Sequence, residues 1–185
     1  MRTILLLALA ACGFHSTATA EVDSGAATGD APLGPPPATP CPGYAFLEPA
    51  LIPSSYLVVT APAQFKIAEQ SCEASQGHLA IVDSDVERML VAAMVTNGWV
   101  GFSDLKNEGT WIDVAGRSSS YMAAHWAMNE PSTGDNDNCA FLMGASGLNA
   151  TNCGKADGAA GDMRGFVCEC GDGLQGSTSN FLRPD

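Results

Sequence analysis

Apolar residues in this chain recur with two different periods, and these periods predict both strands and helices. Residues 56–59 form a β-branched and aromatic run, which is typical of a strand. Downstream, Phe65, Ala68 and Cys72 fall at i, i+3 and i+7 and so share one helix face. Gly77 then supplies the stop signal. The pattern predicts a strand followed by a helix that carries Cys72 into the core.

A capping box predicts the second helix, because Ser84 is followed three residues later by Glu87. Asn97-Gly98 ends this helix. The apolar residues expected to face the core are Val86, Leu90, Ala93 and Met94. A short apolar run at 99–102 follows and predicts a buried strand.

The pattern becomes irregular between residues 129 and 138, and residues 140–143 then restore a strand. Two helices, several short strands and one long loop region predict an α+β fold. Because binding residues concentrate on loops held by a rigid scaffold, we expect any binding face to lie on this loop region.

The N-terminus carries an apolar run, residues 4–11, that is too short to cross a bilayer as a helix and is placed like the core of a signal peptide. We therefore expect an exported protein. A bacterial lipobox ends at Cys12, which predicts removal of residues 1–11 and lipidation of that cysteine, whereas an A-x-A motif predicts removal of residues 1–20 and a soluble chain. Lipidation is favoured because the apolar run stops directly at Cys12.

Composition divides the rest of the chain into three parts. Residues 21–40 are mostly Ala, Gly, Pro and Thr with acids and no aromatic residue, so they cannot bury enough apolar surface to offset their ordering entropy. We predict a disordered tether at 12–40, one domain at 41–170 and a flexible C-terminal tail at 171–185. The chain has 8 basic and 20 acidic residues, an imbalance that disfavours nucleic acids and anionic membrane surfaces as partners.

The chain has seven cysteines, and if Cys12 carries lipid, six remain in an oxidising compartment. That even number predicts three disulfides. A zinc site built from residues 168–170 with Cys139 and Cys153 is the alternative, because thiolates bind zinc. We disfavour it, since the paired C-x-x-C spacing of zinc sites is missing and the chain is predicted to be exported.

An ordered series of signals resembles one domain family. The series comprises the helix 65–72, Gly-His-Leu-Ala-Ile at 77–81, Trp-Val-Gly-Phe at 99–102, Gly-Thr-Trp at 109–111, Trp126, Glu130-Pro131, Cys139, Cys153 and Phe-Val-Cys-Glu at 166–169. This order is similar to that of the C-type lectin-like domain. The resemblance implies an α+β, disulfide-stapled fold with two helices, short antiparallel β-sheets and a long loop region. Such domains display loops that bind a ligand, which in many members is a sugar held on calcium.

The resemblance also implies how the cysteines pair. Its long bridge corresponds to Cys72–Cys168 and its short bridge to Cys139–Cys153. Long-form members carry an N-terminal cysteine whose partner lies just before the first long strand, but Ser54-Ser55 occupies that place here. We expect Cys41 to bond Cys170 instead, because the first and last strands of this fold run side by side.

The family's calcium ligands come from a Glu-Pro-Asn triplet, an acid before the third cysteine of the domain and a Trp-Asn-Asp triplet. Glu130 and Pro131 match the first triplet, whose proline follows a cis bond in the family. Asp137 matches the acid, and Asn149 matches the asparagine of the later triplet. The resemblance implies that Glu130, Asp137 and Asn149 are the calcium ligands, and the Glu-Pro order is similar to that of mannose-type members.

Three positions depart from the family pattern. Ser132 replaces the asparagine, Ala150 replaces the final aspartate and Leu148 replaces the tryptophan. Calcium takes six to eight oxygen ligands, so the losses predict weak binding, with a Kd of about 10⁻⁴ to 10⁻³ M. If the loop shifted by a residue or two, Asp135 and Asn136 would be the residues to replace the missing calcium ligands.

Each candidate also has an ordinary structural interpretation. Glu130 is able to accept hydrogen bonds from loop amides, Asp137 to hold a turn, and Asn149 to act as a turn residue. Catalysis is disfavoured, because Glu130 and Asp137 lie on a loop whose family role is coordination, and His78 belongs to a structural segment. The ligand-binding candidates are therefore Glu130, Ser132, Asp137 and Asn149.

These observations predict a non-enzymatic, exported recognition module that binds a carbohydrate or surface glycoconjugate with weak calcium dependence. The alternative is the same domain used without calcium for protein interaction or adhesion. We expect a cell-envelope lipoprotein on an outer surface, or a secreted soluble protein. A membrane is contacted only through the N-terminal lipid, and nucleic acid is not a partner.

Overall fold

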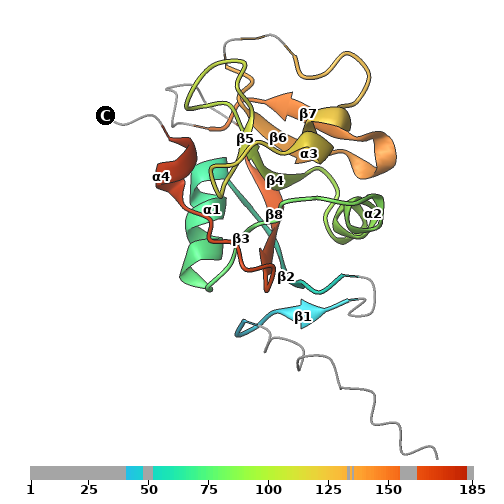
Figure 1. Ribbon diagram of the computed structural model, residues 1–185, viewed down its shortest axis with the longest axis vertical. Helices are drawn as coiled ribbons and strands as arrows, with labels where there is room; N and C mark the ends of the chain where they lie inside the picture. Colours follow the sequence, from blue (N-terminus) through green and yellow to red (C-terminus); the bar gives the residue numbers. More distant parts are fainter. Residues whose placement is uncertain (1–40, 48–51, 133, 135, 155–161, 183–185) are drawn as a thin grey trace, which may run out of the picture. The chain divides into compact units, whose positions relative to one another are not determined.

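The computed structural model describes residues 41–47, 52–132, 134, 136–154 and 162–182 (Figure 1). The predicted signal peptide, Cys12 and the tether at 12–40 lie outside the described residues. The elements are β1 Ala45–Phe46, β2 Ser55–Ala63, α1 Phe65–Ala74, β3 His78–Leu79, α2 Asp85–Met94, β4 Gly98–Ser103, β5 Ile112–Asp113, α3 Ser120–Ala124, β6 Cys139–Leu142, the 3-10 helix η1 Gly144–Ser146, β7 Leu148–Thr151, β8 Arg164–Cys170 and α4 Thr178–Phe181. Among these residues no helix has the length and apolar character needed to cross a bilayer.

The described strands form one eight-stranded sheet in the order β1-β2-β8-β4-β6-β7, with β3 paired to β8 and β5 paired to β4. β8 is central, because it pairs antiparallel with β2 and β3 and parallel with β4. The predicted α+β class with two main helices is confirmed. The short antiparallel sheets that the resemblance implies are instead joined into one mixed sheet, since β8 connects them.

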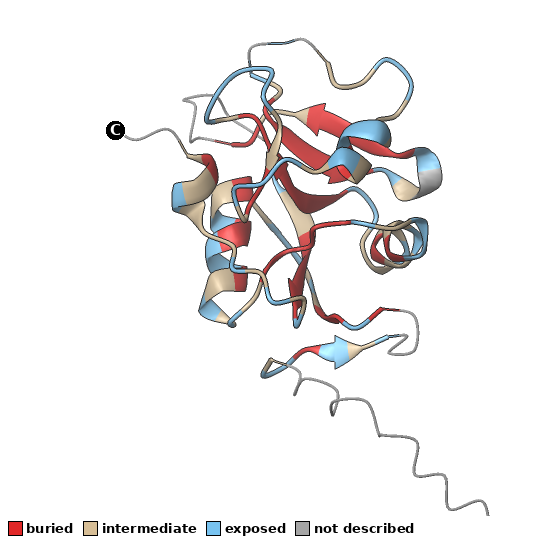
Figure 2. Ribbon diagram, viewed as in Figure 1, coloured by how far each residue is buried: buried red, intermediate tan, exposed pale blue. Residues whose placement is uncertain are grey.

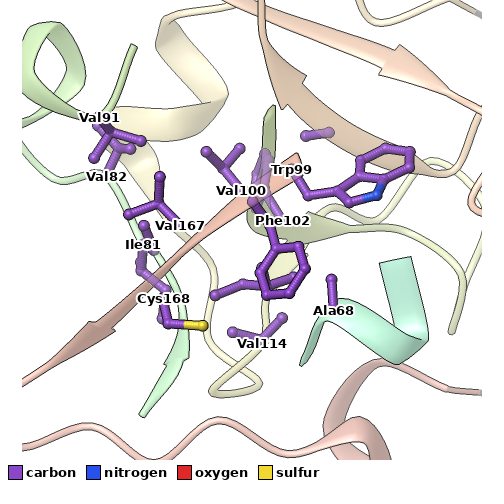
Figure 3. Packing of buried hydrophobic residues seen from close by; sticks show 14 of the residues in the cluster. Ala68, Ile81, Val82, Val91, Trp99, Val100, Phe102, Val114, Val167 and Cys168 are labelled. Atoms are coloured by element: carbon purple, nitrogen blue, oxygen red, sulfur yellow. The ribbon is translucent and has the colours of Figure 1, made fainter. Parts of the chain in front are cut away.

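The core lies between the sheet and α1, and the face predicted for this helix is confirmed (Figure 2). Phe65, Ala68 and Cys72 are all fully buried. The Phe65 ring packs edge-on against Trp99 of β4, with 5.6 Å between ring centroids. Figure 3 shows Trp99 and Phe102 in one cluster with Val91 of α2 and Val167 of β8. Burying each such aromatic side chain stabilises the fold by about 1.5–3 kcal/mol.

The second helix buries a face that overlaps only in part with the one predicted, since Leu90 and Met94 are partly buried against the core. Val86 and Ala93 are exposed, while Glu87 and Val91 are buried. The Glu87 carboxylate is buried because it accepts hydrogen bonds from the Tyr56 hydroxyl at 2.6 Å and from the Asp83 amide at 2.8 Å. The capping glutamate therefore also has a partner in the interior, which apolar periodicity does not reveal.

Residues 171–182, which composition assigns to a flexible tail, pack against the domain at Phe181. Phe181 is fully buried, and its ring packs edge-on against Phe65 at 5.3 Å. Its segment is tied down by the Thr178 amide, which donates to Glu73 at 2.6 Å, and by the Ser177 amide, which donates to the Val114 carbonyl at 3.0 Å. The segment is mostly polar, but the single buried ring of Phe181 gives it enough apolar surface to pack against the domain. Residues 183–185 lie outside the described residues.

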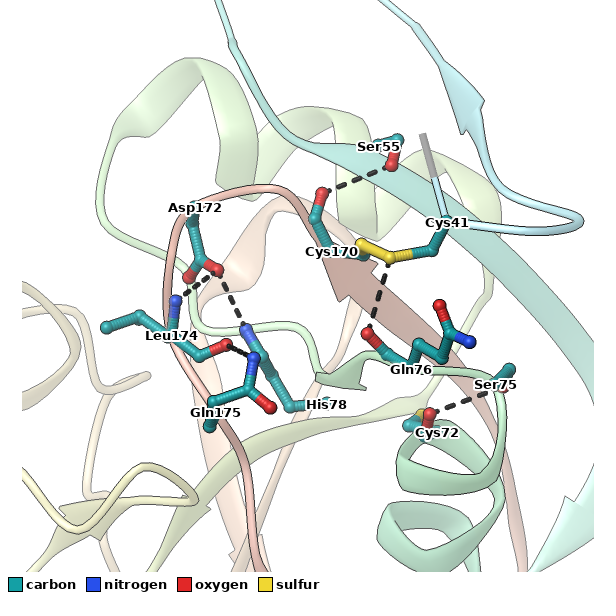
Figure 4. The surroundings of a disulfide bond; sticks show 10 residues. All are labelled: Cys41, Ser55, Cys72, Ser75, Gln76, His78, Cys170, Asp172, Leu174 and Gln175. Carbon is teal, nitrogen blue, oxygen red and sulfur yellow. Dashed lines mark hydrogen bonds and ion pairs between the residues drawn. A yellow bond between two sulfur atoms is a disulfide. The ribbon is translucent and has the colours of Figure 1, made fainter. Parts of the chain in front are cut away.

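All three expected disulfides are present: Cys41–Cys170, Cys72–Cys168 and Cys139–Cys153. Cys41–Cys170 has a Cα–Cα distance of 6.2 Å and lies where β2 and β8 pair, at the register partners Ser55 and Cys170 (Figure 4). The alternative zinc site on these cysteines is therefore excluded, since their sulfurs are bonded to one another.

Candidate functional site

The candidate site lies on the long loop between α3 and β6, next to strand β7. The disulfide Cys139–Cys153 fastens this region, because Cys139 begins β6 and Cys153 follows β7. The Glu130–Pro131 peptide bond is cis, as the resemblance implies. The loop thus has a fixed turn beside a strand that the disulfide holds in place.

Glu130 joins this loop to β7. Its carboxylate oxygen Oε2 accepts a hydrogen bond from the Ser132 amide at 2.8 Å and another from the Ala150 amide at 3.0 Å. Charged acceptors make stronger hydrogen bonds than neutral ones, so the half-buried carboxylate anchors the loop. The alternative structural interpretation, that Glu130 accepts from loop amides, describes these contacts.

Asp137 approaches the same point from the other side of the loop. The Ser132 hydroxyl donates to its Oδ2 at 2.7 Å, and the Asp137 amide donates to the Gly134 carbonyl at 2.9 Å. Three of the four predicted site residues, Glu130, Ser132 and Asp137, are therefore brought together in one chain of hydrogen bonds.

Asn149 is placed differently from the other three. Its side chain is buried, and its amide nitrogen Nδ2 donates to the Gly147 carbonyl at 3.2 Å. Within the described residues, no hydrogen bond joins this side chain to Glu130, Ser132 or Asp137. The contact with Gly147 matches the turn role that was the alternative for this residue.

Leu148, at the position of the family's tryptophan, is a core residue. It is 2% exposed, its amide donates to the His125 carbonyl at 2.9 Å, and its own carbonyl accepts from Ala127 at 2.8 Å. The neighbouring Trp126 and Trp111 rings pack edge-on at 4.5 Å. These contacts pack the first residues of the site loop against the core.

The donor set fits calcium only partly. It offers the carboxylates of Glu130 and Asp137 and the hydroxyl of Ser132, fewer oxygens than the six to eight that calcium takes. One oxygen of each carboxylate already accepts a hydrogen bond. Position 150 presents an amide N–H to Glu130 rather than a carboxylate to an ion. These residues fit a weakly held calcium ion and do not fit a tight one.

Sequence reasoning missed a second polar cluster at the end of β7. Thr151 donates to Asp162 at 2.8 Å, and Arg164 forms an ion pair with the same carboxylate at 2.6 Å. The Thr151 hydrogen bond, followed by Arg164, lowers the pKa of Asp162. The Arg164 guanidinium also stacks over Phe141 at 3.6 Å from the ring centroid. Asp162 and Arg164 are neighbours in sequence, but no sequence pattern relates them to Thr151, which lies on a different strand.

The exposed side chain of Met128 was also missed. It is 89% exposed and lies two residues before Glu130. An exposed thioether beside a polar cluster offers apolar contact next to hydrogen-bonding groups, as ligand sites commonly do.

Comparison with known proteins identifies the family. The model of the lectin C-type domain matches residues 61–169. The chain belongs to the C-type lectin domain family. Its domain is therefore a non-enzymatic binding domain, and its three disulfides indicate an extracellular location.

Among curated proteins, the domain is similar to a perlucin-like protein of Mytilus galloprovincialis, with 27% identity over 110 residues, 55% of this chain and 66% of the relative. It is also similar to the hepatic lectin of Gallus gallus, with 30% identity over 89 residues, 46% of this chain and 43% of the relative. The chain thus spans between about two fifths and two thirds of these relatives.

Solved structures share the fold. The cow CD23 carbohydrate-recognition domain, solved in the presence of a GlcNAc2Man3 oligosaccharide, has a TM-score of 0.58 and 22% identity over 75% of this chain and 98% of that one. A calcium-independent type II antifreeze protein has a TM-score of 0.59 and 19% identity over 70% of this chain and 92% of that one. At these identities the likeness shows the fold alone.

Proposed function

We propose that this protein is an exported carbohydrate-recognition module whose sugar site is built on Glu130, Ser132 and Asp137 and holds calcium weakly. The hydrogen bonds that Ser132 makes to Glu130 through its amide and to Asp137 through its hydroxyl, beside the cis Glu130–Pro131 bond, carry the proposal. They gather two carboxylates and a hydroxyl on a loop that the Cys139–Cys153 bridge fastens.

Sugar hydroxyls fit this donor and acceptor set. A carboxylate only accepts hydrogen bonds, so Glu130 and Asp137 accept from two neighbouring sugar hydroxyls, while the Ser132 hydroxyl both donates and accepts. Met128 offers the apolar contact that a sugar's C–H face needs. The Glu-Pro order favours mannose-type sugars, whose adjacent hydroxyls suit two acceptors on one short loop.

Calcium, when bound, supplies a positive charge that neutralises the two carboxylates and polarises sugar hydroxyls. Glu130, Asp137 and the Ser132 hydroxyl would hold it, and Asn149 would join only if its amide left Gly147. Because affinity follows ligand charge and rigidity, the Kd of such a site is about 10⁻⁴ to 10⁻³ M, which extracellular calcium partly saturates.

The N-terminal prediction completes the proposal. Lipidation at Cys12 would fix the chain to a membrane, and residues 12–40 would hold the domain away from that surface. Cleavage at residue 20 would instead release it. A recognition domain on a tether suits binding to glycoconjugates on a neighbouring surface.

A glycan array probed with the mature protein tests the proposal, with 5 mM calcium chloride in one arm and chelator in the other. We expect binding to mannose-type glycans that falls at least tenfold in Glu130→Gln and in Asp137→Asn. Glu108→Gln is the matched control, since Glu108 is exposed on a different loop, and it retains full binding. Equal glycan signals from wild type and Glu130→Gln would refute this site.

Calcium-independent recognition is the second candidate, and one observation favours it. The Ser132 hydroxyl and the Ala150 amide already bridge the two sides of the loop through Asp137 and Glu130. These hydrogen bonds hold the loop in its conformation without the need for a bound ion. Glycan or protein binding that is equal with calcium and with chelator, yet lost in Glu130→Gln, assigns this second function.

A further inference from the structure

A cluster of metal-binding side chains lies apart from the sugar site, at the end of β8 that carries Cys170. His78 comes from β3, Glu169 from β8 and Asp172 from the segment that follows β8. One ligand atom from each residue lies within 4.8 Å of the other two. Figure 4 shows His78 and Asp172 facing each other beside the Cys41–Cys170 bridge.

The tautomer of His78 is fixed by the backbone. Its Nδ1 lies 2.9 Å from the Leu79 carbonyl oxygen, and a carbonyl only accepts, so Nδ1 carries a proton. The other nitrogen, Nε2, faces Asp172 Oδ1 at 3.1 Å. Metal-binding histidines are oriented in this way, with one ring nitrogen donating to a carbonyl and the other turned toward the ion. The imidazole is fully buried, so this orientation is not set by solvent.

The two carboxylates are also held by the backbone. Glu169 is 3% exposed, and its Oε2 accepts from the Ile81 amide at 2.9 Å. Asp172 is half-buried, and its Oδ1 accepts from the Leu174 amide at 3.0 Å. Supporting hydrogen bonds of this kind position metal ligands before an ion arrives.

A cavity of about 220 Å³ adjoins the cluster and gives an ion and its water ligands a route in. Its described lining residues are Ile52, Pro53, Ser54, Asp83, Ser84, Glu87, Glu169 and Asp172. Four of these are acids, and no lysine or arginine is among them. Buried carboxylates are costly unless a cation or a proton neutralises them. The His78 imidazole lies 3.1 Å from Asp172, so a divalent ion would take the place of the proton between Nε2 and this carboxylate.

We propose that His78, Glu169 and Asp172 bind one divalent transition-metal ion, for which zinc is the probe, with water completing its coordination. Zinc accepts imidazole nitrogen and carboxylate oxygen together, whereas calcium prefers oxygen alone. Tetrahedral zinc ligands lie roughly 3.4 Å apart, so the three side chains need only a small closing movement. An ion here connects β3, β8 and the segment that leads to α4.

This proposal is independent of the sugar site. Figure 1 shows the long site loop beside β7, away from the end of β8 where β3 and β2 lie. Zinc is therefore expected to change stability and leave glycan binding as it is. The competing interpretation is a metal-free ion pair between His78 and Asp172.

Zinc titration of the oxidised mature protein tests the proposal, after dialysis against chelator, by calorimetry and thermal unfolding. We expect one equivalent of zinc to bind and raise the melting temperature. Asp172→Asn is expected to weaken zinc binding at least tenfold, because it removes a charged ligand. The fold should be kept, since the asparagine oxygen still accepts from the Leu174 amide. His125→Gln is the control, because that histidine stacks on Tyr121 outside the cluster, and it binds zinc like wild type.

Three results overturn the proposal. Absence of binding at 0.1 mM zinc leaves only the ion pair. Unchanged binding in Asp172→Asn removes the aspartate from the site. Calcium binding that is equal in wild type and in His78→Gln removes the histidine from it. If His78→Gln does not fold, Asp172→Asn and Glu169→Gln decide the matter, with circular dichroism to confirm their fold.

Discussion

The hydroxyl of Tyr56 on β2 donates a 2.6 Å hydrogen bond to Oε1 of Glu87 on α2, and both side chains are buried. The bond connects the first long strand to the second helix. The other carboxylate oxygen accepts from the Asp83 amide, so Glu87 also caps the helix N-terminus. One acid therefore serves both the helix and the tertiary fold.

Replacing Tyr56 by Phe is expected to cost about 1–3 kcal/mol of unfolding free energy, because it leaves Oε1 of Glu87 buried without its partner. Urea denaturation followed by circular dichroism measures this loss. Tyr121→Phe is the matched control, since Tyr121 donates a similar 2.7 Å bond to the exposed carboxylate of Asp85. A loss in Tyr121→Phe as large as in Tyr56→Phe would show that burial of the acceptor does not decide the cost.

This pair also shows why the buried face of α2 was predicted only in part. Hydrophobic periodicity places polar residues outside, and nothing in the local pattern shows that Tyr56, far along the chain, satisfies Glu87. For α1 the same reasoning placed Phe65, Ala68 and Cys72 correctly and gave no sign of the buried Glu69. Periodicity therefore finds the apolar residues of a helix face and misses the buried acids.

The buried carboxyl group of Glu69 is expected to make the stability of the fold depend on pH. It is fully buried on α1, one oxygen accepts from the Leu79 amide at 2.7 Å, and burial raises its pKa to about 7. A raised pKa means that the folded state binds the proton more tightly than the unfolded state. Its contribution is complete below the unfolded pKa of about 4.3 and is lost as the pH rises through about 7.

Glu69→Gln imitates the protonated acid and is therefore expected to remove this pH dependence. The variant should be more stable than wild type at pH 8 and close to it at pH 4.5. Denaturant midpoints measured at both pH values in the presence of chelator check the difference. A Glu69→Gln variant whose midpoints follow wild type at both pH values would contradict the raised pKa.

The burial of Phe181 implies that the C-terminal segment contributes to the stability of the fold. Phe181→Ala removes a fully buried ring that packs on Phe65, and large-to-small changes of this kind cost about 3–5 kcal/mol. Ser179→Ala, at an exposed position of the same helix, is expected to have little effect. Thermal unfolding of both variants gives the comparison. Equal melting temperatures would mean that the segment contributes no stability.

The candidate site was predicted in part, for reasons that differ among its residues. Glu130, Ser132 and Asp137 lie close in sequence on one loop, so their meeting follows from loop length once the turn is fixed. Asn149 belongs to a strand, where its side-chain direction is set by pairing with β6, and its hydrogen bond to Gly147 has no sequence signal. The zinc cluster was invisible in sequence because His78 and Asp172 are 94 residues apart.

Restoring the family's missing ligands is expected to strengthen calcium binding. Ser132→Asn supplies an amide oxygen beside Glu130, and Ala150→Asp supplies a carboxylate from β7, whose backbone amide already meets Glu130. Calcium affinity rises with ligand charge and number, so the double variant should bind about 10 to 100 times more tightly than wild type. Isothermal calorimetry with calcium, and melting temperatures at 1 mM calcium against chelator, measure the gain.

The matched control is Ser132→Ala with Ala150→Ser, which alters the same two positions without adding a charge. It should bind calcium no better than wild type. Ligand that binds only the folded state raises the melting temperature, so the double gain variant should show a calcium-dependent rise that exceeds the wild-type rise. If the gain variant folds and yet binds calcium no more tightly, Glu130 and Asp137 do not point at a common ion. The loop would then be held by the hydrogen bonds from Ser132 to Asp137 and from Ala150 to Glu130, without an ion. This result would favour the calcium-independent function.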